Sequence, residues 1–476
     1  MLTLLLASGC AAWLGSDPAE AVNTVANQTS RTAAPAPDEP APPLEHSSTA
    51  RPADLSLAVA RAPVLDGELE ALRRRAQARV LRGEAAVDSL ALGHFVAIEN
   101  EAALSGFHAA LARLRGGSDG DGKLRILSYG ASHTQSDLYT GYLRAYLQSR
   151  FGDGGQGFVL LGRVNRWYRT LDSFTDHQGL QVLHARMRSD ADYEPLGLFG
   201  AALTGKYADG YAEVVTAKDS PNTRFEIQYL ARPDGGDFGL QIDGKAVARV
   251  ETRADAERLG VYSFQTPPGS HRIGVRLSGN GPVRLFGVIG ESDAPGVVLD
   301  TLGISGSRMI DQLRWNEPIW TEAVRRRAPD LVTFAYGTNE AADPRLSVAT
   351  YEAELRAVLT RMRRALPETS CVLIAPLDLA NSVRPRLLKV SEVQRRVSRD
   401  FSCGFWDGYA FMGGQGSIRR WIYARPPLAS PDQIHLTRRG YVYAGTALGD
   451  ALMRAYDAAT LQGVEPARVA TSPAAP

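Results

Sequence analysis

One short segment near residue 130 constrains the fold of this chain more than any other. An apolar run, Leu124–Ser128, breaks at Gly130 and is followed by apolar residues at helical spacing from Leu138 to the glycine at Gly152. A strand, a sharp turn and a helix in this order present one side chain at the carboxyl end of a parallel sheet. That side chain is Ser132. Because a serine that only caps a helix gives the same local pattern, the segment alone establishes no function.

The pattern of the C-terminal half predicts that this first strand belongs to a parallel sheet. Apolar strand-like runs alternate there with long helical stretches, of which Tyr351–Leu366 and Val390–Phe401 are the clearest. The runs are Gly296–Leu302, Asp330–Tyr336, Ser370–Pro376 and Gly404–Asp407. Such alternation implies right-handed crossovers and a sheet covered by helices on both faces. We therefore expect an α/β domain.

The stretch 163–292 has a different pattern, with short strand-like runs separated by turns instead of helices. The runs are Tyr211–Thr216, Arg224–Leu230, Phe238–Ile242, Ala246–Glu251, Val261–Gln265, Arg272–Leu277 and Val283–Ile289. Asp243-Gly244, between two alternating runs, predicts a tight hairpin. We expect an antiparallel β-sandwich inserted into the α/β domain.

The α/β domain is thus predicted in two parts, 64–162 and 293–457, on either side of the insert. The first part begins with expected helices at Leu65–Arg82 and Glu84–Leu114, which precede the strand that leads to Ser132.

The composition changes at both ends of the chain. Residues 11–63 and 458–476 are rich in Ala and Pro, and they hold too little apolar material to offset the entropy of ordering. We expect both to be disordered. Residues 1–10 are an apolar run that ends in small residues and Cys10, and this run is too short to span a bilayer.

A carboxylate and an imidazole stand three residues apart near the end of the predicted domain. In Ser430–Thr437, Asp432 can accept a hydrogen bond from one ring nitrogen of His435 while the other nitrogen faces outward. Two glycine-containing motifs precede this pair. They are Gly303–Ser307 and Thr333–Glu340.

Taken in order, these motifs resemble the four blocks of the SGNH (GDSL-like) hydrolase family. The family has Ser, Gly, Asn and Asp-x-x-His, and the matching residues here are Ser132, Gly306, Asn339, and Asp432 with His435. The resemblance implies a flavodoxin-like, three-layer α/β fold.

The resemblance also assigns roles to these residues. Ser132 would be the nucleophile, His435 the general base and Asp432 the group that orients the imidazole. The oxyanion hole would consist of the backbone N–H groups of Ser132 and Gly306 and the side-chain amide of Asn339.

One residue departs from the family pattern. Ala131 stands where the family usually has Asp, so the turn around Ser132 lacks one polar support. His133 follows the serine directly, and we expect it to stabilise this turn rather than to act as a base.

Within this family, peptidoglycan O-acetyl esterases carry an inserted, carbohydrate-module-like domain, and the layout here is similar to theirs. This resemblance implies removal of acetyl groups from peptidoglycan or another cell-envelope polysaccharide. A polysaccharide O-acetyltransferase with the same triad is one alternative, and a wall-binding lipoprotein without activity is another. The insert would either bind glycan or shape the rim of the site. Trp167, Tyr168 and Trp421 are candidates for stacking on sugars, whereas Trp406 lies within a strand and is expected in the core.

Composition excludes several other classes of function. The net charge of +1 gives no electrostatic reason to expect nucleic acid as a partner. For the same reason, glycan binding is expected to be insensitive to salt. No group of cysteines and histidines has metal-ligand spacing, and the motifs imply no cofactor.

The cysteines of the chain are Cys10, Cys371 and Cys403. The run before Cys10 resembles the lipobox of a bacterial lipoprotein, which implies a membrane anchor on Cys10 and a place on the periplasmic side of the envelope; an ordinary apolar N-terminus is the alternative. Cys371 stands at the start of one predicted strand and Cys403 just before the next. If these strands are neighbours in the sheet, either a disulfide or two buried thiols fits.

Overall fold

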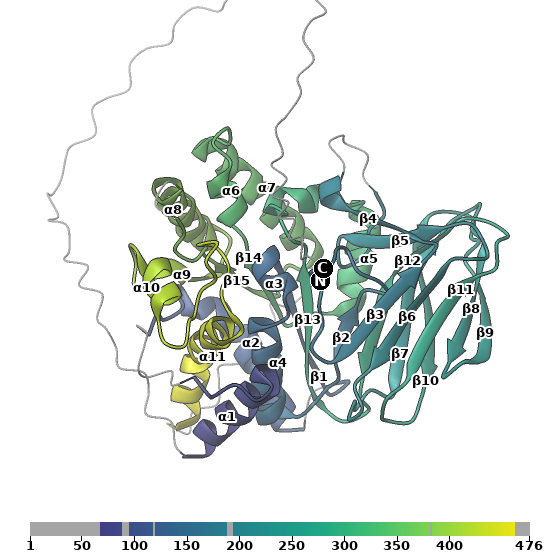
Figure 1. Cartoon of the computed structure of the whole chain (residues 1–476), viewed down its shortest axis with the longest axis horizontal. Helices are drawn as coiled ribbons and strands as arrows, with labels where there is room; N and C mark the ends of the chain where they lie inside the picture. Colours follow the sequence, from purple (N-terminus) through teal and green to yellow (C-terminus); the bar gives the residue numbers. More distant parts are fainter. Residues whose placement is uncertain (1–66, 88–94, 118–119, 188–193, 381–382, 462–476) are drawn as a thin grey trace, which may run out of the picture. The chain divides into compact units, whose positions relative to one another are not determined.

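The computed structural model describes residues 67–87, 95–117, 120–187, 194–380 and 383–461 (Figure 1). A five-stranded parallel sheet of order β13-β1-β14-β15-β16 forms its centre. The strands are β13 (Gly296–Gly303), β1 (Lys123–Gly130), β14 (Leu331–Ala335), β15 (Ser370–Ile374) and β16 (Gly404–Trp406). This order, 2-1-3-4-5 among the five strands, is that of flavodoxin-like folds, and the predicted fold class is confirmed.

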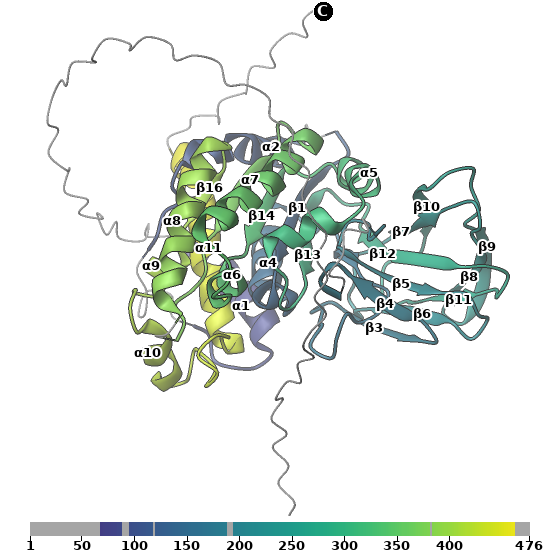
Figure 2. The ribbon, with the colours of Figure 1, turned by 90° about the horizontal axis from the view of Figure 1, so that it is seen from above.

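Helices cover both faces of this sheet, and alternate residues of each strand point to opposite faces (Figure 2). In β14, Phe334 packs in the cluster that includes side chains of α5, α7 and α8, whereas Leu331 packs in the cluster of α1, α2, α4 and α11. The first set is α5 (Glu317–Arg327), α7 (Val348–Ala365) and α8 (Arg384–Asp400). The second set is α1 (Gly67–Leu81), α2 (Ser105–Arg115), α4 (Tyr139–Phe151) and α11 (Arg438–Leu461).

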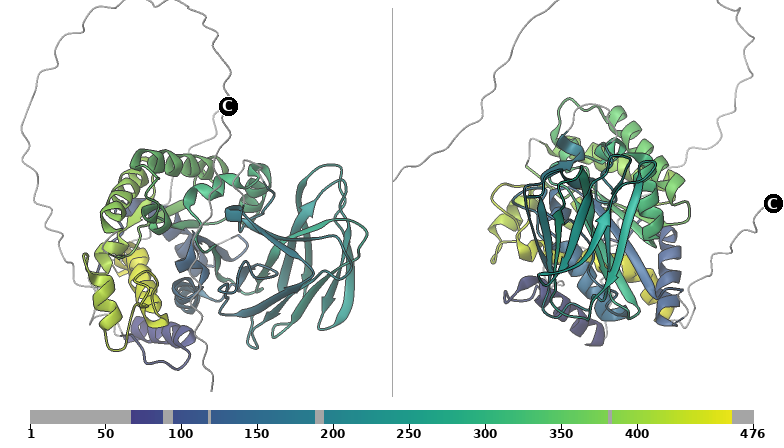
Figure 3. Two further views of the ribbon diagram at one scale, coloured as in Figure 1. Left: turned by 45° about the horizontal axis from the view of Figure 1, so that its top comes forward. Right: turned by 90° about the vertical axis from the view of Figure 1, so that its right-hand side faces the viewer.

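The insert is a β-sandwich of two antiparallel sheets, as predicted (Figure 3). One sheet contains β2 (Gly157–Val159), β4 (Gln181–His184), β5 (Ala201–Gly205), β7 (Arg224–Ala231), β10 (Arg258–Gln265) and β12 (Val283–Glu291). The other contains β3 (Ser173–Gln178), β6 (Tyr211–Thr216), β8 (Asp237–Ile242), β9 (Lys245–Glu251) and β11 (Arg272–Leu277). Asp243 and Gly244 connect β8 to β9, both with positive φ, as the predicted hairpin requires.

Sequence patterns missed the four strands β2 to β5. β2 is only three residues long, and β3 is a mostly polar strand that pairs with β6 alone. No residue of β4 is fully buried. Short or exposed strands lack the alternation on which the prediction relied. β2 also places the start of the sandwich before residue 163.

A buried ionic network joins the sandwich to the parallel sheet. Asp300 of β13 accepts hydrogen bonds from Arg327 Nε at 2.6 Å and from the backbone N–H of Phe158 in β2 at 2.8 Å. Arg327 also pairs with Glu291 at the end of β12, and Glu291 pairs with Arg125 of β1 at 2.9 Å. Burial by itself raises the pKa of Glu291, but the two guanidinium groups lower it to about 2. The sandwich and one face of the sheet also share one continuous hydrophobic cluster.

The expected helix at Glu84–Leu114 is wrong in the described residues before Glu101. The described part of that stretch becomes regularly helical only in a single 3-10 turn, Glu101–Leu104, and in α2. Before them, Glu99 runs extended and exchanges backbone hydrogen bonds of 2.8 and 3.0 Å with Phe405 of the edge strand β16. Asn100 then takes a left-handed conformation, with φ of 55°. Pairing with a sheet edge therefore overrode the helical spacing.

A disulfide joins Cys371 of β15 to Cys403, which precedes β16. Their Cα atoms are 4.7 Å apart, because the two residues start neighbouring strands. The expectations for Cys10, for residues 1–63 and for residues 462–476 lie outside the described residues. Residues 458–461, assigned to the tail, continue α11.

The ionic network predicts the effect of two adjacent substitutions. Arg327→Met leaves Asp300 and Glu291 without their shared cation, so the free energy of unfolding should fall by about 3–5 kcal/mol. Arg326→Met removes the neighbouring ion pair with Glu226. Because the Arg326 side chain is 47% exposed, this change should lower the free energy of unfolding by no more than about 1 kcal/mol. Urea denaturation measures both. If the two variants lost equal free energy of unfolding, the ionic network would not be what joins the sandwich to the parallel sheet.

The disulfide predicts a cross-linked peptide. Proteolysis of unreduced, denatured protein should release one peptide pair joined through Cys371 and Cys403, which mass spectrometry identifies. Cys371→Ala together with Cys403→Ala should lower the free energy of unfolding by about 2–4 kcal/mol. Recovery of both peptides as free thiols, after alkylation in denaturant, would exclude the bridge.

Candidate active site

The structure brings the three predicted triad residues into one hydrogen-bonded chain. Ser132 is the first residue of α3 (Ser132–Gln135), directly after β1, and Asp432 and His435 lie in the loop before α11. His435 Nε2 is 2.9 Å from Ser132 Oγ. His435 Nδ1 is 2.7 Å from Asp432 Oδ2. This arrangement allows a proton to pass from the hydroxyl to the imidazole while the carboxylate holds the ring.

A tight turn holds the carboxylate and the imidazole in position. Asp432 Oδ1 accepts the backbone N–H groups of Ile434 and His435, each at 3.0 Å. Between them, Gln433 takes a left-handed conformation with φ of 60°. Partial burial raises the pKa of Asp432, but the bonds from the His435 ring and from these two N–H groups outweigh it and lower the pKa. The carboxylate therefore stays ionised beside the imidazole.

The nucleophile turn depends on a close approach of its own residues. A Cβ at Gly130 would lie 2.0 Å from Thr134 Oγ1, so only glycine fits there. Thr134 Oγ1 in turn bonds the Tyr139 hydroxyl at 2.8 Å. Ala131, where the family has Asp, is buried and gives no side-chain cap to α3.

Asp137 is a support for this turn that sequence analysis did not identify. It is buried and pairs with Arg144 at 2.8 Å. Its oxygens also accept the Thr301 hydroxyl of β13 at 2.7 Å and the Leu171 backbone N–H of the insert at 2.9 Å. The only signal in the sequence was a carboxylate among apolar residues at helical spacing. That signal does not reveal its partners, because they lie far away along the chain.

The predicted oxyanion donors come from the carboxyl ends of three neighbouring strands. Gly306 follows β13 and has a left-handed φ of 75°, and Asn339 lies in α6 (Thr338–Ala342) after β14. The loop that carries Gly306 is tied to α3, because the Ser305 N–H donates to Gln135 Oε1 at 2.8 Å. Among the described residues, no acceptor bonds the backbone N–H of Ser132 or Gly306. Asn339 Nδ2 donates to Ser307 O at 2.8 Å, which fixes the amide beside this loop.

Glu340 links the two loops that carry Gly306 and Asn339. Its carboxylate accepts the N–H of Met309 at 2.8 Å and the N–H of Gly337 at 2.9 Å, and its side chain is buried. Burial raises the pKa of Glu340 to about 7, although the two N–H groups act in the opposite direction. Glu340 therefore titrates near neutral pH within the framework of the site.

His133 packs beside the triad and is not part of it. Its ring lies 5.4 Å from the ring of His435, and its Nδ1 is 2.9 Å from the Tyr441 hydroxyl. Burial, with a smaller contribution from His435, lowers the pKa of His133 to about 3. The ring is thus neutral at physiological pH. It contacts the side chains of α11 and the triad loop, whereas we had expected it to support the turn.

The structure changes the set of candidate sugar-stacking residues. Trp167 is 58% exposed, but Tyr168 and Trp421 are 7% and 5% exposed and pack in the core. The last two expectations are therefore wrong, because neither ring offers a free face. Trp406 is buried at 2% exposure, as predicted.

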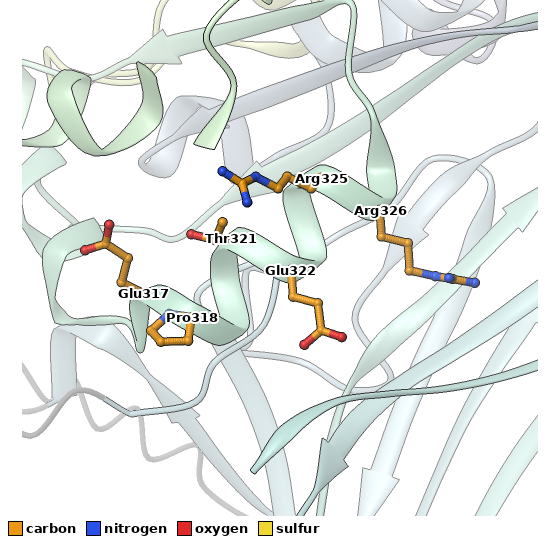
Figure 4. A pocket seen from close by; sticks show the side chains of 6 residues that line it. All are labelled: Glu317, Pro318, Thr321, Glu322, Arg325 and Arg326. Atoms are coloured by element: carbon orange, nitrogen blue, oxygen red, sulfur yellow. The ribbon is translucent and has the colours of Figure 1, made fainter. Parts of the chain in front are cut away.

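Neither of two hollows in the described structure is lined by Ser132, Asp432 or His435. A small apolar pocket of about 50 Å³ lies behind His133, at the ends of β14 and β15. A wider hollow of about 850 Å³ runs along α5, between Glu317 and Arg326 (Figure 4). All six of its lining residues belong to that one helix and none is a predicted site residue. Within the described ranges, no group of three or more His, Cys, Asp or Glu residues could hold a metal ion, and no helix is long and apolar enough to cross a membrane.

Comparisons with known proteins agree with this fold. A sequence model of the GDSL-like lipase/acylhydrolase family matches residues 273–443. A solved structure of a peptidoglycan O-acetylesterase is 25% identical, with a TM-score of 0.64, and the match covers 76% of this chain and 99% of that one. Over residues 273–443 the chain is similar to the GDSL-like lipase/acylhydrolase family. It resembles the peptidoglycan O-acetylesterase over both the sheet and the sandwich.

Other solved structures are less similar to this chain. Family two carbohydrate esterases from Clostridium thermocellum and Cellvibrio japonicus are 10% and 13% identical, with TM-scores of 0.27 and 0.26. Each match covers 60% of this chain and 98% or 99% of the other. No curated protein matches the chain. The family match starts after Ser132, because the insert separates the nucleophile from the other motifs.

The titration of Glu340 predicts a pH-dependent stability. Its folded pKa lies above the ordinary value of 4.5, so the unfolded chain loses the proton first and stability falls as pH rises from about 4.5 to about 7. Glu340→Gln should lower the melting temperature at pH 5, because one N–H loses its acceptor. The difference from the native protein should then shrink by pH 8. Glu392→Gln, an exposed residue of α8, is the control. A difference that stays constant with pH would contradict the titration.

Proposed function

We propose that the protein is a serine esterase that removes O-acetyl groups from a cell-envelope polysaccharide, with peptidoglycan as the first candidate. The observation that carries the proposal is the chain from Ser132 through His435 to Asp432, with separations of 2.9 and 2.7 Å. A wall-binding protein without activity would have no need of such an aligned nucleophile, base and carboxylate.

The reaction would proceed in two halves through an acetyl-enzyme. Ser132 Oγ attacks the ester carbonyl carbon while His435 Nε2 takes its proton, and Asp432 stabilises the imidazolium. The oxyanion would be held by the N–H groups of Ser132 and Gly306 and by the free amide hydrogen of Asn339. Collapse breaks the bond to the sugar oxygen, which leaves with the proton from His435. Water then attacks the acetyl-enzyme by the same route and releases acetate.

The substrate class rests on likeness and on the compartment. The similar structure is a peptidoglycan O-acetylesterase, and its match to this chain includes the insert. The Cys371–Cys403 disulfide suits an oxidising compartment, as does the proposed export with a lipid anchor on Cys10. Substrates of an exported esterase would be polymers of the cell envelope.

Single substitutions test the triad. Ser132→Ala and His435→Ala should each lower turnover of p-nitrophenyl acetate by about three orders of magnitude or more, and Asp432→Ala should cost less. Asn339→Ala should cost about 10²–10³-fold. The control is His271→Ala. His271 Nδ1 lies 2.8 Å from Asp243 Oδ2, close to the separation in the His435–Asp432 pair, but this pair lies on the sandwich. It should leave turnover unchanged.

Covalent labelling gives an independent test of the nucleophile. A serine-directed fluorophosphonate should modify Ser132 and should not modify Ser132→Ala protein. Persistent labelling of that variant, or full turnover by it, would refute the assignment. Product analysis with a sugar acceptor then separates acetate release from acetyl transfer, which the same triad would also support.

A further inference from the structure

Five arginines line a groove of about 350 Å³ where the insert meets the α/β domain. They are Arg82, Arg163, Arg166, Arg169 and Arg438, and we call this feature the arginine groove. No carboxylate is among its described lining residues. Such a concentration of one charge is unexpected in a chain with a net charge of +1.

The arginine groove adjoins the active site. Ser136, four residues after the nucleophile Ser132, lines it. Arg438, three residues after His435, lines it as well. The segments that carry both catalytic side chains therefore continue directly into its wall. A polymer whose ester lay at Ser132 would extend along the arginines.

The loop that carries three of the arginines is fixed to the nucleophile segment at two points. Asn165 and Gln135 exchange two side-chain hydrogen bonds of 3.1 Å each. Further along, the Leu171 N–H donates to the buried Asp137 at 2.9 Å. Gln135 and Asp137 both follow Ser132 closely, so the loop and the nucleophile keep one relative position. Charged groups that are held in place before binding lose little entropy on binding.

The positive charges of the arginine groove are largely uncompensated. Only Arg438 has a carboxylate partner among the described residues, Glu84 at 3.6 Å. Arg82 donates to a backbone carbonyl, as does Arg163. Arg166 and Arg169 are exposed and have no acidic partner in the described part of the chain. The nearby Asp172 does not offset them, because it already pairs with Arg79 and Arg144.

Two exposed aromatic rings accompany the arginines. The guanidinium of Arg166 lies 4.7 Å from the centre of the Trp167 ring, and that of Arg163 lies 4.9 Å from the Phe174 ring. Trp167 and Phe174 are 58% and 49% exposed. Apolar ring faces next to bidentate cation donors suit a sugar ring that bears a carboxylate.

We infer that the arginine groove binds an acidic glycan, and that it selects esters whose neighbouring groups on the polymer carry carboxylates. This inference rests on the proposed esterase function for its biological meaning, but the binding itself requires no turnover. It replaces the expectation that glycan binding is insensitive to salt. A net charge near zero does not reveal a local cluster of arginines. Because salt screens their charge, glycan binding in the arginine groove should weaken as the salt concentration rises.

Binding to Ser132→Ala protein tests the inference without any reaction. The probe is polygalacturonate, and its methyl ester is the neutral match; tryptophan fluorescence and calorimetry report binding. We expect polygalacturonate to bind at least about tenfold more tightly than the ester, and less tightly at 300 mM than at 50 mM salt. Adding Arg166→Gln and Arg169→Gln should remove this preference. The matched control, Arg75→Gln with Arg253→Gln, removes two exposed arginines outside the groove and should keep it.

Three results would overturn the inference. They are equal affinity for the two polymers, an unchanged preference after Arg166→Gln and Arg169→Gln, and equally tight binding of single-stranded DNA, which would mean a general polyanion surface. Pull-down with peptidoglycan before and after amidation of its carboxylates then identifies the source of the charge. Because the nucleophile is absent throughout, failure here is distinct from failure of the proposed esterase function.

Discussion

The buried carboxylate of Asp137 is the constraint on which the candidate site depends. Asp137 lies at the end of the nucleophile segment, its charge is balanced by Arg144 of α4, and its oxygens accept hydrogen bonds from β13 and the insert. A buried charge is stable only with its partners in place, so these three parts are positioned together. In a turn where Ala131 gives no polar support, this network supplies the rigidity that a local side chain would otherwise provide.

The insert is joined closely to the α/β domain and to the loops of the candidate site. The Asp300–Arg327 pair and a shared hydrophobic cluster join it to the sheet. Its Arg186 donates to Ser305 O at 3.2 Å, in the loop of the proposed oxyanion hole. Of the two roles left open by the sequence, these contacts favour shaping the rim. The arginine groove adds glycan binding as a second proposed role, and other contacts, Asn165 with Gln135 and Leu171 with Asp137, hold its loop.

Catalysis and substrate choice would then draw on different physical properties. The triad needs short, directional hydrogen bonds, and its residues come from loops at the carboxyl ends of strands. The arginine groove needs only charge and exposed rings, so its residues come from loops around the site. A change in the glycan could be accommodated there without disturbing Ser132 or His435.

The sequence by itself determined the features that local patterns encode. These were the parallel strands, most of the sandwich, the Asp243-Gly244 hairpin, and the residues that the structure assembles as Ser132, Asp432 and His435. Only the tertiary structure decided what depends on distant segments. It buried Trp421, paired Cys371 with Cys403, and placed Glu99, within an expected helix, in a sheet-edge contact. It also gathered into one groove arginines from residues 82 to 438, because charge clusters depend on which loops meet and not on periodicity.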